Sequence, residues 1–281
     1  MDVVKNVRLH DMTSQVSARC RAMTGTRPFA KPEDEQTLTP MGHPARYMLP
    51  TLDAHQGHYV NEGFTRRLYQ NLLRPGDVAI DLGANLGGHT RSMALCVGPG
   101  GVVHAFEPNR HLMAGLAAIG PQVKVWPFAV GDRLSVETLT IPNGLEELAA
   151  IIPVNDLLPN HRDFTLMSTV QLRIDDLPEF DEALPAFIKI DVERREAAAL
   201  RGMQGLLARA RPPLVLENAT AEIEALLAGV DYVLRGFNGG GHNDLGLPNA
   251  IGWPNEKLDL LARALPTADQ WDQCIRQAVG S

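Results

Sequence analysis

The feature that most constrains the fold is a short apolar run that ends in a glycine-containing turn. Val78–Leu82 reads Val-Ala-Ile-Asp-Leu, and the chain continues Gly83-Ala84-Asn85-Leu86-Gly87 before a helical pattern begins. A run of this length, followed by glycine and then by a helix, is typical of the first βα unit of a Rossmann-like sheet. Glycine is needed where the backbone bends sharply and approaches a ligand with no side chain between. Such turns lie at the carboxyl ends of the strands, where open α/β sheets bind their ligands.

Short apolar runs and helical patterns alternate after this turn. This alternation predicts an α/β fold with a mainly parallel, doubly wound sheet and helices on both faces. The further strands are predicted, in chain order, at Val102–Phe106, 123–130, 186–192 and Leu214–Glu217. The helices are predicted at 61–72 (with Asn61 as N-cap), 90–97, 110–119 and 195–210.

Residues 134–174 interrupt the alternation. Period-two patterns at 136–141 and 169–174 predict two more strands, which either extend the main sheet or build a separate lid. A chain of 281 residues with 44% hydrophobic content suits one large α/β domain with added segments. We expect a partly flexible arm or cap at 1–58, the main domain at 59–254 with 134–174 as an insertion or lid, and C-terminal helices at 255–281.

An acidic residue follows the second predicted strand. Glu107 comes directly after Val102–Phe106. A carboxylate at this position can accept hydrogen bonds from both ribose hydroxyls of an adenosine. The glycine turn and the strand-terminal acid are each weak signals, but in this order they predict a nucleotide-type ligand.

Two ligands compete for such a turn. A dinucleotide loop needs a third glycine at G-x-G-x-x-G spacing so that the pyrophosphate rests on a helix N-terminus, and the turn Gly83–Gly87 lacks it. Asp81 precedes the turn, and acids are favourable beside a sulfonium and an amino group but unfavourable beside a pyrophosphate. The residues therefore favour S-adenosylmethionine over NAD(P), and an NAD(P)-dependent oxidoreductase is the main alternative.

Four motifs occur in an order that resembles the FkbM-type methyltransferases over roughly residues 59–254. They are Asp81-Leu82-Gly83-Ala84-Asn85-Leu86-Gly87, Phe106-Glu107-Pro108, Ala129-Val130-Gly131-Asp132 and Phe187-Ile188-Lys189-Ile190-Asp191-Val192-Glu193. The resemblance implies a class I methyltransferase fold, S-adenosylmethionine as donor with S-adenosylhomocysteine as product, and usually O-methylation of sugars, glycolipids or secondary metabolites. It also implies a set of cofactor-binding residues: Asp81, Gly83, Asn85 and Gly87 at the methionine end, Glu107 at the ribose, Ala129 and Val130 at the adenine, and Pro108 beside Glu107 in the same motif.

The acceptor side is predicted at the end of the strand that leads to Asp191. Methyl transfer to a hydroxyl requires that the oxygen lose its proton, and a positioned carboxylate base typically contributes about 10²–10⁴-fold. Asp191 is the first candidate for the base or acceptor-orienting group, and Glu193 the second. The alternative is that these acids, and Glu196 after them, cap the following helix. Lys189 lies in an apolar strand, so we expect it to pair with a carboxylate or to extend to the surface.

The chain departs from the family at one position. The family usually continues Asp-Val-Glu-Gly-x-Glu, whereas this chain has Asp191-Val192-Glu193-Arg194-Arg195-Glu196. Either the local turn differs, or Arg194 faces the acceptor pocket and recognises an anionic group. The second alternative function is a non-catalytic protein that has the same fold and binds the cofactor without turnover.

The carboxylate and amide that follow the fifth strand allow two roles. Asp191, Glu217 and Asn218 could bind Mg²⁺, which prefers oxygen ligands and would acidify an acceptor hydroxyl. We favour the alternative, in which Glu217 and Asn218 contact substrate or cap a helix. The three cysteines, Cys20, Cys96 and Cys274, have no zinc or disulfide spacing.

Charge, hydropathy and cysteine usage limit the classes of binding partner and cellular compartment that suit this chain. A net charge of −7 argues against nucleic acid and favours a small-molecule or carbohydrate acceptor. No apolar run approaches the roughly 18 residues of a membrane span. Dispersed cysteines and the lack of a signal-peptide pattern predict a cytoplasmic protein.

Overall fold

A computed structural model describes residues 52–145, 148–152 and 161–280 of the chain. All of these residues belong to one compact unit. Most of the arm predicted at 1–58 therefore lies outside the described residues.

The described residues contain a seven-stranded sheet in the order β3-β2-β1-β7-β8-β10-β9. Its strands are β1 (Val78–Leu82), β2 (Val102–Phe106), β3 (Val123–Trp126), β7 (Phe187–Ile190), β8 (Leu214–Glu217), β9 (Tyr232–Arg235) and β10 (Asn249–Pro254). The first five strands in that order are parallel, whereas β10 runs antiparallel to both β8 and β9. The carboxyl ends of β1, β2 and β7 therefore meet at one edge.

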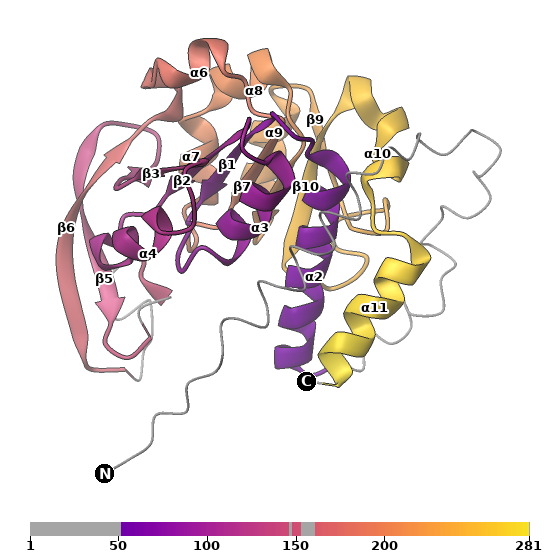
Figure 1. Ribbon diagram of the computed structural model, residues 1–281, viewed down its shortest axis with the longest axis horizontal. Coiled ribbons are helices and arrows are strands. Elements are labelled where there is room, and N and C mark those ends of the chain that lie inside the picture. Colours follow the sequence, from indigo (N-terminus) through magenta and orange to yellow (C-terminus); the bar gives the residue numbers. More distant parts are fainter. Residues whose placement is uncertain (1–51, 146–147, 153–160, 281) are drawn as a thin grey trace. The chain divides into compact units, whose positions relative to one another are not determined.

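Helices cover both faces of this sheet (Figure 1). One apolar cluster joins Ala79 of β1 to α2 (Ala54–Leu72), α3 (Gly88–Val97), α10 (Leu258–Ala264) and α11 (Ala268–Val279). The other joins Ile80 and Leu82 to α6 (Glu179–Glu182), α7 (Glu196–Arg201), α8 (Gln204–Ala210) and α9 (Ala221–Ala228). Consecutive residues of β1 thus pack on opposite faces, as the pleat of a strand requires. The short α4 (Met113–Ala117) packs beside β3.

A second sheet stands apart from the first. It has the order β4-β6-β5, with β4 (Ala129–Val130), β5 (Ser135–Pro142) and β6 (Phe164–Leu172). Leu139, Ile141 and Met167 form its own apolar cluster. The strands predicted at 136–141 and 169–174 therefore do not extend the main sheet, and Figure 1 shows β5 and β6 beside it.

The single strand predicted at 123–130 is wrong. The chain forms β3 in the main sheet and β4 in the second, with Pro127 and Phe128 between them. Proline lacks the N–H that a continuous strand would donate, so pairing ends there.

Three helix predictions also need correction. The helix predicted from Asn61 begins at Ala54, where Asp53 and Gln56 form a capping box, and Asn61 is instead buried and accepts a hydrogen bond from the Asn249 amide. The helix predicted at 195–210 breaks into α7 and α8 at Gly202, which lies so close to the Gly131 carbonyl oxygen that a Cβ there would be only 1.9 Å away. The segment 110–119 is a 3₁₀ turn (Arg110–Leu112) followed by α4.

Two further 3₁₀ turns lie at Ile174–Asp176 and Asn255–Lys257. None of the described helices is both long and apolar enough to cross a membrane.

Candidate functional site

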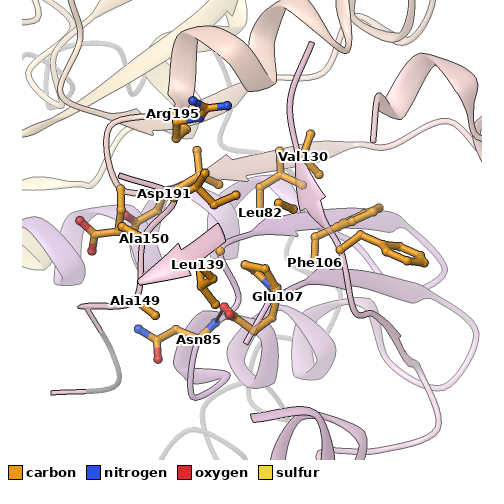
Figure 2. Close-up of a pocket in the computed structure, with 17 residues that line it drawn as sticks. Leu82, Asn85, Phe106, Glu107, Val130, Leu139, Ala149, Ala150, Asp191 and Arg195 are labelled. Atoms are coloured by element: carbon orange, nitrogen blue, oxygen red, sulfur yellow. Dashed lines mark hydrogen bonds between the residues drawn. The ribbon is translucent and has the colours of Figure 1, made fainter. Parts of the chain in front are cut away.

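A cavity of about 650 Å³, its open mouth included, lies where β1, β2 and β7 end (Figure 2). The main sheet supplies its floor, and the second sheet with residues 149–151 supplies further walls. The lining residues are Leu82, Gly83, Asn85, Phe106, Glu107, Pro108, Phe128, Ala129, Val130, Leu139, Ala149, Ala150, Ile151, Asp191, Val192, Glu193 and Arg195. Eight of the ten predicted site residues are among them. Asp81 and Gly87 are not.

The turn after β1 depends on its two predicted glycines. Gly83 has φ +76°, and a Cβ there would lie 1.8 Å from the Asp191 carbonyl oxygen. Gly87 has φ +82° and precedes α3, and a Cβ there would meet Leu116 and Ile119. These glycines let β1 and β7 approach each other and let α3 pack closely, so Gly87 shapes the turn from outside the cavity.

The backbone amides of this turn are engaged within the protein. Gly83 and Ala84 both donate to the Phe106 carbonyl, Asn85 donates to the Glu107 carboxylate, and Gly87 donates to the Ala84 carbonyl. These hydrogen bonds hold the end of β1 against the end of β2 and fix the shape of the turn.

Glu107 is only 6% exposed but lines the cavity. Its two carboxylate oxygens accept hydrogen bonds from the backbone amides of Asn85 (2.8 Å) and Asn109 (2.7 Å). Burial raises the pKa of Glu107, although these two hydrogen bonds oppose the shift. A carboxylate oxygen can accept more than one hydrogen bond, so the fixed group still has capacity for ligand hydroxyls.

Asp81 lies behind the cavity, fully buried. Its Oδ2 accepts a hydrogen bond from the Thr90 hydroxyl at 2.6 Å, and its Oδ1 lies 3.8 Å from Lys189 Nζ. Asp81 therefore does not line the cavity, and instead contacts Thr90 of α3 and Lys189 of β7.

Lys189 joins the two sides of the site. Its buried ammonium lies 2.9 Å from Asp191 Oδ2, which confirms that this lysine pairs with a carboxylate. Burial lowers the pKa of Lys189, but Asp191 and Asp81 raise it more, and the net shift is upward. Asp191 is therefore held in place by a permanent cation.

Glu62 extends this network into α2. Its carboxylate lies 2.6 Å from His89 Nε2, and the Tyr69 hydroxyl lies 3.1 Å from His89 Nδ1. Burial raises the pKa of Glu62, but the hydrogen bond and charge of His89, with Lys189 beyond it, lower that pKa to about 2.

Residues 81–234 match the family model of the methyltransferase FkbM domain. The chain belongs to the FkbM methyltransferase family. The strand order and the family together confirm the predicted class I methyltransferase fold. A search of curated proteins found no match.

Solved structures similar to this FkbM family member include three methyltransferases. An FkbM methyltransferase from Methylobacillus flagellatus KT is 16% identical, with a TM-score of 0.40 over 74% of this chain and 58% of that protein. An S-adenosylmethionine-dependent O-methyltransferase from Thermotoga maritima is 13% identical, with a TM-score of 0.33 over 78% and 58%. A precorrin-6y C5,15-methyltransferase from Geobacter metallireducens GS-15 is 14% identical, with a TM-score of 0.36 over 60% and 70%. The chain thus spans somewhat more than half the length of the first two.

The acids of this FkbM domain that the sequence predicts on the acceptor side differ in position. Asp191 and Glu193 line the cavity, whereas Glu217 and Asn218 do not. Burial and the neighbouring Asp191 and Glu196 raise the pKa of Glu193. Glu196 is buried and accepts hydrogen bonds from the amides of Val192 and Arg194, so it caps the turn before α7.

The predicted Mg²⁺ site gains no support. Among the residues that the structure describes, no group of three or more His, Cys, Asp or Glu side chains could hold a metal ion. Asp191 Oδ2 is already engaged with Lys189.

Arg194 stands where the family usually has glycine, and its backbone adopts a conformation that favours glycine. Glu193 and Arg194 have φ angles of +51° and +69°. Side chains rarely adopt this left-handed region, which explains why glycine suits the position in the family. Arg194 is exposed and does not line the cavity, whereas the next residue, Arg195, does. Sequence reasoning missed Arg195, because only the conformation of this turn decides which arginine points inward.

We expect the stability of this FkbM domain to depend on Glu217 as pH rises. Burial, followed by the charges of Asp191, Glu193 and Glu196, raises the pKa of Glu217 from 4.5 to about 7. The folded state therefore holds this proton more tightly than the unfolded state, and the stabilisation present below pH 4.5 is lost as the pH approaches 7. Glu217→Gln should match the wild type at low pH and exceed its free energy of unfolding above about pH 7, measured by urea denaturation.

The matched control has the opposite sign. The hydrogen bond from Arg211 lowers the pKa of Glu256 to about 2, so Glu256→Gln should lose stability at neutral pH. Parallel pH profiles for the wild type and Glu217→Gln would contradict the prediction.

Proposed function

We propose that the chain transfers the methyl group of S-adenosylmethionine to a hydroxyl oxygen of a small molecule or carbohydrate, such as a sugar, a glycolipid or a secondary metabolite. Family membership supports methyl transfer. The observation that carries the proposal is the Glu107 carboxylate, which two backbone amides fix in the lining of a cavity that Asp191 and Glu193 also line.

The lining residues fit S-adenosylmethionine. Phe106, Pro108, Phe128 and Val130 form an apolar wall for an adenine, and Glu107 accepts hydrogen bonds from ribose hydroxyls. The carboxylates of Asp191 and Glu193 complement a sulfonium and an ammonium group.

The two cavity acids take different roles in the proposed reaction. The bound cofactor supplies an electrophilic methyl carbon. Glu193, whose pKa is raised, takes the proton of the acceptor hydroxyl as that oxygen attacks, because a base works best with a pKa near the working pH. Asp191 accepts a hydrogen bond from Lys189 through one carboxylate oxygen, and it orients the acceptor through the other. Orientation of this kind can supply up to roughly 7–11 kcal/mol of the barrier.

Glu107→Gln should weaken S-adenosylhomocysteine binding about 10- to 100-fold, because one charge-assisted hydrogen bond is worth roughly 1.5–3 kcal/mol. The amide group would also face a backbone N–H that now donates to an oxygen. Isothermal titration calorimetry measures the affinity. The control is Glu222→Gln at an exposed site. Equal affinity of Glu107→Gln and the wild type would refute the ribose assignment.

Two titrations separate the proposal from its alternatives. Binding of S-adenosylhomocysteine at micromolar concentration without binding of NAD(P) supports a methyltransferase, and the reverse result supports an oxidoreductase. Release of S-adenosylhomocysteine with a panel of hydroxylated sugars and phenols then tests turnover. Tight cofactor binding with no turnover on any acceptor would indicate a non-catalytic binding protein. The net charge of −7 favours a small acceptor over nucleic acid.

A further inference from the structure

Arg195 is the cation that lines the cavity, on the side away from the proposed ribose site. Figure 2 shows Arg195 and Glu107 at opposite sides of the cavity, with Asp191 between them in this view. Glu107, Asp191 and Glu193 give the rest of the lining a negative charge. Arg195 therefore makes one end of the cavity electrostatically different from the other.

A fully buried glutamine holds this arginine. Gln171 of β6 accepts a hydrogen bond from Arg195 Nη2 at 2.8 Å through its Oε1. Its amide nitrogen donates to the Arg133 carbonyl at 3.2 Å and lies 3.3 Å from the Ser135 hydroxyl. The second sheet thus fixes the Gln171 side chain, and Gln171 in turn fixes the Nη2 group of Arg195.

The charge of Arg195 is not neutralised by the protein. No carboxylate of a described residue forms a salt bridge with Arg195, whereas Arg201 pairs with Asp132 and Arg211 with Glu256. The Nε of Arg195 is buried, so it is not open to a ligand, whereas Nη1 is not buried and has no hydrogen-bond partner among the same residues. A partly buried guanidinium that is oriented at one nitrogen and keeps an open Nη edge suits a planar oxyanion, which that edge can bind with two parallel hydrogen bonds.

We propose that Arg195, positioned by Gln171, binds a carboxylate or phosphate of a ligand in this cavity. The inference rests on the proposed methyltransferase function. Two ligands could present the anion. One is a charged substituent of the acceptor, which would make the substrate a hydroxyl compound that also carries an acid. The other is the amino-acid carboxylate of the cofactor.

Binding measurements on the full chain distinguish the two sources. In the cofactor arm, S-adenosylhomocysteine is compared with 5′-methylthioadenosine, which lacks the amino-acid group. In the acceptor arm, glucuronate and glucose 6-phosphate are compared with glucose, first on protein saturated with S-adenosylhomocysteine and again without it. We expect Arg195→Gln to weaken the anionic ligand of one arm about 10- to 100-fold and to leave its neutral counterpart unchanged.

The neighbouring arginine provides the matched control. Arg194→Gln removes the same charge from an exposed residue outside the cavity, so it should leave every affinity unchanged. Arg195→Lys keeps the charge but not the planar fork, and should show an intermediate loss. Should Arg195→Gln fail to fold, Arg195→Lys and Gln171→Leu are measured in its place.

The proposal fails if Arg195→Gln binds every anionic probe as the wild type does, or if it weakens neutral and anionic ligands equally, because packing would then explain the loss. It also fails if the wild type prefers no anionic probe to its neutral counterpart. A wild type that binds neither S-adenosylhomocysteine nor 5′-methylthioadenosine would instead overturn the proposed function, and the acceptor arm without cofactor would still decide the anion site.

Discussion

Gly83→Ala should destabilise the protein by roughly 2–6 kcal/mol and abolish S-adenosylhomocysteine binding by the fraction that folds. The added Cβ would lie 1.8 Å from the Asp191 carbonyl oxygen, so the ends of β1 and β7 must separate. The φ of +76° adds the strain of a left-handed alanine. Because Asn85 and Asp191 flank this contact, the separation also displaces two walls of the cavity.

Urea denaturation and calorimetry measure the two effects of Gly83→Ala. The control is Gly88→Ala, five residues further on, where an added Cβ meets nothing within 4 Å. The free energy of unfolding of that variant should lie within about 1 kcal/mol of the wild-type value. If Gly83→Ala matched the stability of Gly88→Ala, the close approach of β1 and β7 would be refuted.

Lys189→Met is expected to cost roughly 3–5 kcal/mol of unfolding free energy, because it leaves the fully buried Asp81 carboxylate without its counter-charge. Lys189 lies 2.9 Å from Asp191 and 3.8 Å from Asp81, and its charge also reaches Glu62. The free energy of unfolding in urea measures the effect.

Lys124→Met is the matched control for Lys189→Met. Lys124 also pairs with a carboxylate, that of Glu179 at 3.2 Å, but it is 47% exposed. An exposed pair contributes about 0–1 kcal/mol. Adding Asp191→Asn to Lys189→Met should recover part of the loss, since it removes one of the uncompensated charges. A loss for Lys189→Met no larger than that for Lys124→Met would show that the buried network adds no stability.

The sequence predicts the cofactor half of the site better than the acceptor half. Leu214–Glu217 coincides with β8, and Gly83 and Glu107 meet in one cavity, because local apolar runs and strand-terminal residues dictate both. The prediction of one strand at 123–130 is wrong because Ala129 and Val130 pair with β6, which is distant in sequence, and so belong to the second sheet. Such long-range pairing leaves no local pattern.

The acceptor half depends on turn conformation. Glu193 and Arg194 both adopt positive φ, and this alone turns Arg195 toward the cavity and Arg194 toward solvent. The sequence offers two adjacent arginines and no means of choosing between them. Gln171 could not be predicted either, since its role follows from the packing of β6 against the turn before α7.

The cavity takes its walls from two sheets with separate apolar cores, the main sheet around Ile80 and the second around Leu139 and Met167. Leu139, Ile141 and Met167 pack with one another at the far part of the β5–β6 hairpin, so they can be exchanged without repacking the residues behind the glycine turn. The proposed adenine wall contains none of these three side chains. Under the proposed function, their exchange should redirect which compounds are modified while donor affinity stays nearly the same, so that substrate range could evolve separately from cofactor use.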